Sequence, residues 1–300
     1  MVKTNKLKSV LVVVARIVAF IAVCCLLFFQ LKKKNFSFDQ FYIIHYWPLI
    51  FTLLLVPINW LIEYKKWLIL LTNIGEQKNT LRRPAFYAGM VTGLLTPAMA
   101  GNFLGRIYYF DKSKRWKLTI HTSTSNFSQF LISMFFGGVA FLFLSGSSVF
   151  LATNYQLAAI ACIVIITCAL YFFGEIFIRF IPLQRLKLIA IMLRRGPSRL
   201  HLLLFSFFRY LLFLIQFSLC LYAFSGFFST QLVAFIALVF MAVTLTPSLF
   251  LGKIVVRESI AVAILGLAGL APIPVLLASL TTWFFNLILP TLWAALKIKR

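Results

Sequence analysis

The sequence predicts an all-α membrane protein: a polytopic helical bundle of about seven spans plus re-entrant or broken helices, with an inverted-topology internal repeat. Hydrophobic residues make up 62% of the 300 residues and charged residues only 12%, a balance that soluble domains do not need. In addition, a short motif occurs twice, about half a chain apart. We therefore expect one integral membrane domain over residues 1–300, with repeat halves of about 1–180 and 181–300.

The distribution of charge supports this class of protein. The formal net charge is +23, but the basic residues lie mostly in short loops between apolar stretches, which is the positive-inside pattern and also favours anionic lipid head groups. We therefore expect a membrane, and not nucleic acid, as the partner of these charges. The pattern predicts a multi-pass protein of the bacterial inner (cytoplasmic) membrane with both termini cytosolic, and it leaves a homo-oligomer open.

The first half begins with two expected spans, from about Ser9 to Leu31 and from about Tyr42 to Leu71. The second is too long for one perpendicular helix, so Lys66 near its end is expected along the cytosolic interface. From Ala85 to Phe110 the chain is interrupted by Thr96-Pro97 and is too short for two spans, which need about 40 residues. We therefore predict a re-entrant hairpin that enters from the cytosol.

A third span is expected from Leu118 to Leu144, with a polar face formed by His121, Ser125, Asn126 and Gln129. The connector from Arg179 to Arg199 is rich in basic residues and is expected to be the main cytosolic loop. Three more spans and a second broken unit complete the chain, at about 156–178, 201–224, 231–271 (the broken unit) and 272–296.

The motif that occurs twice predicts the functional region. Leu95-Thr96-Pro97 returns as Leu245-Thr246-Pro247, 150 residues later. Gly101 and Arg106 return as Gly252 and Arg257, 151 residues later. Because the intervening spans place the two copies in opposite orientations, they predict an inverted repeat, whose substrate site lies at the repeat interface near the midplane.

Candidate site residues follow from this placement. Arg106 and Arg257 are expected to contact phosphate, since a guanidinium can hold phosphate oxygens bidentately. Glu63 and Glu258 would balance these charges or couple transport to protons. Neutral hydrogen bonds are assigned to Asn102, Thr96, Thr246 and Asn59, the last on the same helical face as Glu63. The helix breaks are assigned to Pro97, Gly101, Pro247 and Gly252.

Structural alternatives remain open for several of these residues. Glu63 could instead neutralise Lys66 at the helix end, and Arg257 with Glu258 could be a structural ion pair. Arg106 could extend to the head groups at the interface. Glu175 is expected to neutralise Arg179, one helical turn away. No catalytic, metal or cofactor site is predicted, because the chain has only six acidic residues and its three histidines are isolated.

The ordered set of motifs resembles a known family. It comprises Asn59-Trp60 with Glu63 and Trp67, Ala88-Gly89 before Leu95-Thr96-Pro97, Gly101 and Arg106, and then Pro247, Gly252 and Arg257-Glu258. In these positions the chain resembles the flippase-like transmembrane region of lysylphosphatidylglycerol synthases, in its stand-alone form without the aminoacyl-transferase domain. Many members have glutamate where this chain has Asn102. The resemblance implies paired re-entrant elements and movement of a lipid between leaflets, but not lysyl transfer.

The resulting hypothesis is a flippase-like transporter that moves an anionic or zwitterionic phospholipid, or a lipid-linked head group, across the inner membrane. We expect no cofactor and no catalytic chemistry of its own. Two alternatives stay open. The first is a membrane-embedded transferase acting on a lipid-linked substrate, which would need a carboxylate cluster near one membrane face. The second is a non-transporting partner subunit that recruits a lipid-modifying synthase through the basic connector.

Overall fold

The described part of the chain is entirely helical. The computed structural model describes residues 42–76, 79–96, 101–146, 154–179, 184–194, 196–246 and 250–298, and these ranges contain no strand. The all-α prediction is therefore confirmed for them. The expected span from Ser9 to Leu31 and the two motif prolines, Pro97 and Pro247, lie outside the described residues.

Five of the described helical segments are long and apolar enough to cross a membrane, as a multi-pass membrane protein requires. They correspond to the five spans expected after residue 41, and they are α2 (Trp47–Asn73), α5 (Lys112–Ser145), α6 (Asn154–Arg179), α8 (Arg199–Ser225) and the continuous segment Pro272–Ile298. The basic tract from Lys112 to Lys117 forms the first turns of α5.

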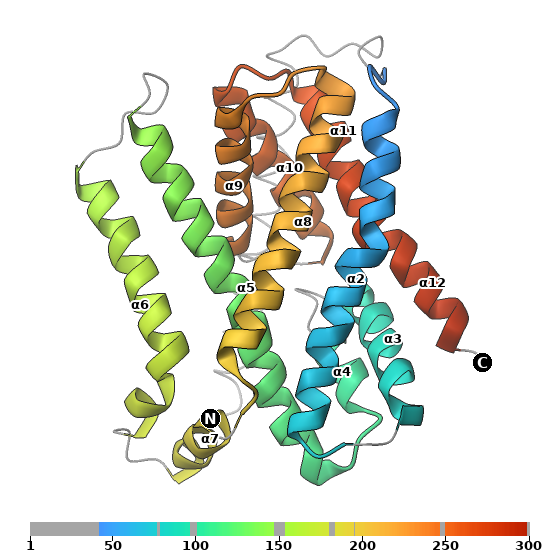
Figure 1. Ribbon diagram of the computed structural model, residues 1–300, viewed down its shortest axis with the longest axis vertical. Helices are drawn as coiled ribbons and strands as arrows, with labels where there is room; N and C mark the ends of the chain where they lie inside the picture. Colours follow the sequence, from blue (N-terminus) through green and yellow to red (C-terminus); the bar gives the residue numbers. More distant parts are fainter. Residues whose placement is uncertain are drawn as a thin grey trace, which may run out of the picture.

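Helices α2 and α8 pack along their length and run antiparallel (Figure 1). The backbone N–H groups of Ile44 and His45, just before α2, donate to the carbonyl of Ala223 near the end of α8, at 2.9 and 3.1 Å. Further along the same pair of helices, the Gln216 side-chain amide donates to the Thr52 carbonyl at 3.0 Å. Polar side chains inside an apolar bundle need such partners, so this interface is a polar seam joining the two halves of the chain.

The first broken unit is a tight helical hairpin in the lower half of Figure 1, made of α3 (Asn79–Leu95) and α4 (Gly101–Ile107). Glycines spaced four residues apart on both helices, a pattern that permits close backbone approach, line their contact: Gly89, Gly93, Gly101 and Gly105. A Cβ at Gly105 would lie 2.6 Å from the Ala88 carbonyl oxygen. The hydroxyl of Thr92 also donates to the Gly101 carbonyl at 2.5 Å.

The second broken unit lies in the upper half of Figure 1 and consists of α9 (Thr230–Leu245) and α10 (Phe250–Leu267). It packs against α5 and α11 through apolar side chains, among them Phe235, Ile236 and Leu265. Gly252 lies within α10. Both broken units predicted from the sequence thus consist of two helices, with the prolines in the short intervals between them.

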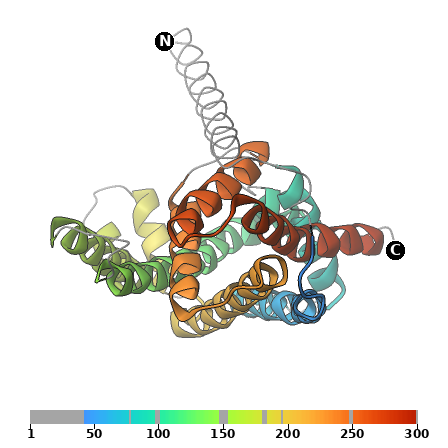
Figure 2. The same cartoon turned by 90° about the horizontal axis from the view of Figure 1, so that it is seen from above.

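The last span, dark red in Figure 2, leads to the C-terminal end at the edge of the bundle, and it changes helix type in its middle. It starts as α11 (Pro272–Trp283), continues as the π-helical turn η3 (Phe284–Ile288) and ends as α12 (Leu289–Ile298). Helix α11 packs on α8 and α10, whereas α12 packs on α3. Helices α6 and α7 (Gln184–Arg194) lie at the edge of the bundle, where α5 is their main neighbour.

Candidate functional site

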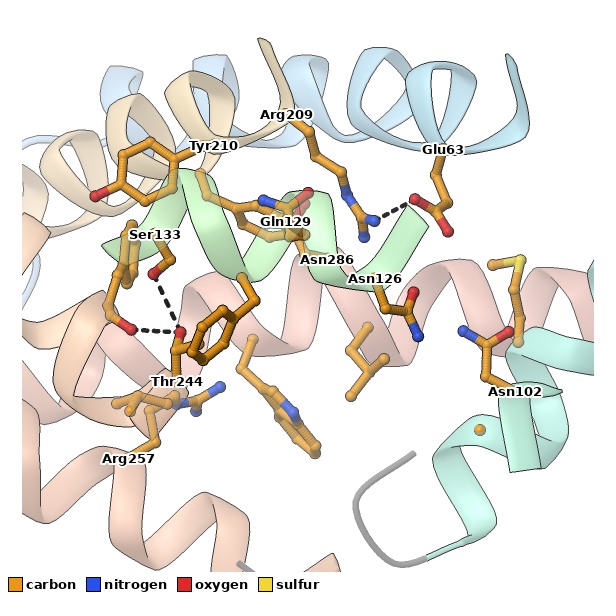
Figure 3. Close-up of a pocket in the computed structure, with 18 of the residues that line it drawn as sticks. Glu63, Asn102, Asn126, Gln129, Ser133, Arg209, Tyr210, Thr244, Arg257 and Asn286 are labelled. Carbon is orange, nitrogen blue, oxygen red and sulfur yellow. Dashed lines mark hydrogen bonds and ion pairs between the residues drawn. The ribbon is translucent and has the colours of Figure 1, made fainter. Parts of the chain in front are cut away.

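A cavity of about 550 Å³ lies between the two hairpins (Figure 3). Its wall is formed by residues of α2, α3, α4, α5, α8, α9, α10, α11 and η3, so both halves of the chain contribute. Most of the wall is apolar, with a small number of charged and amide side chains. A cavity of this size and composition is typical of a ligand-binding site.

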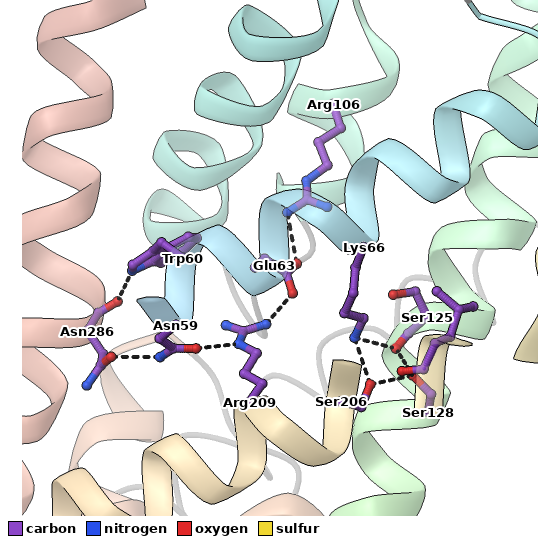
Figure 4. A network of polar contacts seen from close by, with 11 residues as sticks. Asn59, Trp60, Glu63, Lys66, Arg106, Ser125, Ser128, Ser206, Arg209 and Asn286 are labelled. Carbon is purple, nitrogen blue, oxygen red and sulfur yellow. Dashed lines mark hydrogen bonds and ion pairs between the residues drawn. The ribbon is translucent and has the colours of Figure 1, made fainter. Parts of the chain in front are cut away.

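Glu63 of α2 is the centre of the charged part of the wall (Figure 4). One carboxylate oxygen accepts a hydrogen bond from Nη2 of Arg106, on α4, at 3.1 Å, and the other pairs with Nη1 of Arg209, on α8. Arg106 is only 3% exposed, so its side chain points into the bundle and does not extend along the surface towards lipid head groups. One carboxylate therefore joins the first hairpin to the seam between α2 and α8.

An amide chain orients Arg209 from the opposite side (Figure 4). Its Nε donates to Asn59 Oδ1 at 3.0 Å, and Asn59 Nδ2 donates to Asn286 Oδ1 at 2.7 Å. The indole of Trp60 donates to the Asn286 carbonyl at 3.0 Å. Asn286 belongs to the π-helical turn η3, and such turns occur frequently at functional sites. The turn thus connects the last span to the ion-pair network.

Lys66 adds a third cation, a buried one, to the cavity wall. Its ammonium group donates to Ser206 Oγ at 2.9 Å and to the Ser125 carbonyl at 3.3 Å, and the residue is 2% exposed. The Lys66 side chain is therefore enclosed between helices of the bundle. It shares the inward face of α2 with Glu63, one turn away, and the facing helices α5 and α8 supply its hydrogen-bond acceptors.

The charges of this network do not cancel. Three cations, Lys66, Arg106 and Arg209, line the cavity beside the single carboxylate of Glu63. Buried charges that lack a counter-charge carry a large desolvation penalty. The Arg106 guanidinium is stabilised in part by the rings of Trp67 and Phe86, whose centroids lie 5.1 and 5.0 Å away. The remaining positive charge faces the cavity, where an anion would neutralise it.

Unpaired polar atoms lie next to these cations. Among the described residues, Arg106 Nε, Asn102 Oδ1 and Gln129 Oε1 are buried and have no hydrogen-bond partner. All three side chains line the cavity. Because buried polar groups are nearly always hydrogen-bonded in native proteins, they offer one donor and two acceptors to a ligand.

The second hairpin supplies a separate charged group at the other end of the cavity (Figure 3). Arg257 of α10 lines the wall, pairs with its neighbour Glu258 and lies over the ring of Trp283, 5.7 Å from the centroid. Thr244 lies close by and its hydroxyl contacts that of Ser133 at 3.1 Å. Arg257 and Glu258 are thus paired with each other, but as neighbours on α10, so this ion pair does not hold the two hairpins together.

The structure brings most of the predicted site residues together. Glu63, Thr96, Asn102, Arg106 and Arg257 line the cavity. Asn59 and Glu258 are buried behind the wall and contact Arg209 and Arg257 from there.

Three predicted residues have hydroxyl or backbone roles in the hairpins. Thr96 accepts a hydrogen bond from the Gly101 backbone N–H at 2.6 Å, so Gly101 begins α4 under a threonine cap. Thr246 donates to the Ala242 carbonyl at 2.8 Å and is not among the cavity-lining residues, where Thr244 takes its place.

Sequence reasoning did not select Arg209, Lys66 or Asn286. Each is a polar residue inside a strongly apolar span, which is itself a signal for a functional position in a membrane protein. Glu175 pairs with Arg199 at the start of α8, and the side chain of its expected partner, Arg179, lies outside the described residues. The i,i+4 spacing predicts only neighbours on one helix, and this contact joins two helices.

Among the described residues, no group of three or more His, Cys, Asp or Glu side chains lies together as metal ligands would. No protein-family model matches the chain, and no match to it was found among curated proteins or solved structures. The geometry of the cavity is therefore the basis for assigning its function.

Proposed function

We propose that this protein is a flippase-like transporter that binds the head group of an anionic or zwitterionic phospholipid, or of a lipid-linked substrate, in the cavity and moves it between leaflets. One observation carries the proposal: two buried cations, a third that is partly buried, and one carboxylate line a cavity inside an apolar helical bundle. A lipid phosphate supplies the missing negative charge, and guanidinium groups bind phosphate through charge-assisted hydrogen bonds.

We assign roles to four of the charged residues and to two amide side chains. Arg106 and Arg209 contact the phosphate, while Glu63 holds both guanidinium groups in place by pairing with one nitrogen of each. The unpaired Asn102 and Gln129 oxygens accept hydrogen bonds from head-group hydroxyl or ammonium groups. Arg257, at the other end of the cavity, is a second contact for the head group as it moves.

We further propose that the chain is an inverted repeat in which α2, α3, α4 and α5 correspond to α8, α9, α10 and the last span. The packing supports this correspondence. Helix α5 packs on α9 while α12 packs on α3, α8 packs on α11 while α2 packs on α5, and α2 packs on α8 across the seam. The two hairpins lie in opposite halves of the bundle (Figure 1). Inverted repeats of this kind support alternating access around a central site.

We also propose that the chain belongs to the flippase-like family and lies in the bacterial inner membrane with cytosolic termini. The position of its basic residues supports this orientation. Basic residues gather at the lower end of Figure 1, where α2 ends and α3 and α5 begin: Arg82, Arg83, Lys112, Lys114 and Arg115. Such a collection favours the cytosolic side. The lower end would then be cytosolic, and the first hairpin would enter the membrane from that side.

A reconstitution experiment tests the transport proposal. The purified protein is placed in liposomes with fluorescent phosphatidylglycerol or phosphatidylcholine, and leaflet exchange is measured by quenching the outer leaflet. Loss of a charge-assisted hydrogen bond of about 1.5–3 kcal/mol predicts that Arg106→Gln and Arg209→Gln slow exchange by roughly 10- to 100-fold.

Arg83→Gln is the matched control, because Arg83 is an exposed cation on the same hairpin. It should leave exchange unchanged. Folded wild-type protein that moves neither lipid would overturn the proposal and favour a transferase or a partner subunit instead.

A further inference from the structure

A second, smaller hollow of about 380 Å³ lies between α4 and α5. Its wall is almost entirely apolar and is formed by Phe103, Ser123, Asn126, Phe127 and Phe130. Three of these five residues, Phe103, Asn126 and Phe130, also line the main cavity. We call this hollow the α4–α5 groove. It adjoins the charged cavity, from which these shared side chains separate it.

The wall of the groove is held in place by aromatic packing. The ring of Phe127 stacks on that of Phe130, with centroids 5.6 Å apart, and on that of Tyr171 of α6, at 5.9 Å. The Tyr171 hydroxyl donates to the Arg199 carbonyl at 2.9 Å. This side of the groove is therefore built into the bundle, and ligand binding would not have to order it.

We propose that the α4–α5 groove holds an acyl chain of the same lipid whose head group occupies the cavity; this inference rests on the proposed function. The two adjoining sites complement the two parts of a phospholipid. The cavity side offers surplus positive charge from Arg106, Arg209 and Lys66, and the groove offers aromatic rings. A glycerophospholipid carries an anionic phosphate and hydrocarbon chains on one short backbone. The adjoining sites match both parts.

The groove also answers a physical requirement of lipid transport. A head group can enter a polar cavity, but its acyl chains gain nothing from polar surroundings and are best accommodated along apolar surface. The groove lies on α5, a helix long and apolar enough to cross a membrane, and beside α4, which is only seven residues long. The acyl chain can therefore extend beside the short hairpin while the phosphate contacts the arginines.

A pair of tryptophan substitutions on α5 tests this site. Ser123 is exposed and lines the groove, so Ser123→Trp fills the groove without changing the ion-pair network. Val139→Trp is the matched control, since Val139 is exposed on the same helix and outside the groove. We expect Ser123→Trp to slow phosphatidylglycerol exchange at least fivefold and Val139→Trp to leave it unchanged.

A head-group probe separates this inference from the proposed function. Glycerol 1-phosphate carries the phosphate but no acyl chain, so Ser123→Trp should bind it as tightly as the wild type, whereas Arg106→Gln should bind it at least tenfold more weakly. Ser123→Trp that exchanges lipid normally would overturn the groove and leave the transport proposal standing. If Arg106→Gln changes neither lipid exchange nor glycerol 1-phosphate binding, both proposals fail.

Photolabelling gives an independent measurement. Phosphatidylglycerol with a diazirine in its acyl chain is activated in the same liposomes, and the labelled peptides are identified by mass spectrometry. We expect adducts on residues 119–131 that are lost in Ser123→Trp and reduced in Arg209→Gln. Labelling of Ile50 and Leu54, exposed on the outer face of α2, reports bulk lipid and should not change. Groove labelling that is equally strong in Arg209→Gln would overturn the link to the head-group site.

Discussion

The two helical hairpins share a layout but differ in how they are joined to the bundle. In α3–α4, four glycines bring the backbones together, and Arg106 reaches across to a carboxylate on α2. In α9–α10, large apolar side chains pack into the main hydrophobic core, and Arg257 pairs with the adjacent Glu258 on the same helix. Apolar packing holds both hairpins, since Phe86 and Met90 of α3 belong to a second hydrophobic core. The first hairpin is in addition joined to α2 by the Arg106–Glu63 ion pair, whereas the Arg257–Glu258 pair stays within α10.

This difference separates binding from stability within one architecture. A hairpin that is positioned by an ion pair changes its contacts when a ligand competes for the same cation. A hairpin that is buried in a well-packed core resists such change, because core packing tolerates little displacement. We therefore expect the α3–α4 hairpin to respond to ligand, while α9–α10 supports the structure.

The largest expected effect comes from the acid on which the first hairpin depends. Glu63→Gln removes the carboxylate that pairs with the buried Arg106 and with Arg209, and breaking a buried ion pair costs about 3–5 kcal/mol. Glu258→Gln removes the partner of Arg257 alone, whose side chain is 20% exposed, and should cost about 1.5–3 kcal/mol. Unfolding of both variants by SDS in mixed micelles gives the two free energies. Equal losses would contradict the proposed difference between the hairpins.

Glycine substitutions should reveal the second largest contrast. A Cβ at Gly89 would lie 2.8 Å from Asn102 Oδ1 and 2.9 Å from Arg106 Nε, whereas a Cβ at Gly266 of α10 meets nothing within 4 Å. Gly89→Ala should therefore destabilise the protein by about 1–3 kcal/mol through overpacking and displace Arg106. Gly266→Ala should be neutral or stabilise it by about 0.4–1 kcal/mol. Thermal unfolding in detergent measures both, and a neutral Gly89→Ala would show that the hairpin has room to spread.

The smallest effect concerns one hydroxyl in each hairpin. Thr92→Val removes the hydrogen bond to the Gly101 carbonyl, which joins α3 to α4, and should destabilise the protein by about 1 kcal/mol. Thr246→Val removes only a bond to Ala242 within the same helix and should cost less than about 0.5 kcal/mol. Hydrogen exchange of residues 101–107 should quicken in the first variant only. Equal exchange in both would mean that glycine packing alone holds α4.

Much of the fold could be predicted because apolar span length and helix breakers act locally. The two broken units and the five described spans follow from continuous apolar stretches and from Thr96-Pro97 and Thr246-Pro247. The glycine spacing from Gly89 to Gly93 and from Gly101 to Gly105 was also present in the sequence as a packing signal. Spacing on one helix identifies a small face, but not which helix it meets.

The site was less predictable because it is assembled from contacts between distant segments. Glu63 was expected to balance the charge of Arg106 or Arg257. The carboxylate does pair with Arg106, but its second partner is Arg209, 146 residues away. Nothing in the sequence around Arg209 distinguishes an inward-facing arginine from one that extends to the membrane interface. Lys66 posed the same ambiguity, and only the position of Ser206 and Ser125 on neighbouring helices resolves it.

The π-helical turn of the last span has a geometric consequence of its own. A π-turn accommodates one residue more than an α-helical turn, so it rotates everything beyond it by about 100° relative to an uninterrupted helix. This phase step lets α11 face α8 and α10 while α12 faces α3. Deleting a single residue within Phe284–Ile288 would restore an ordinary helix and keep the α12 face towards α3, because the lost residue and the lost π-turn shift the phase by equal and opposite amounts. The span that looks like one helix is therefore a joint between two faces set at a fixed angle.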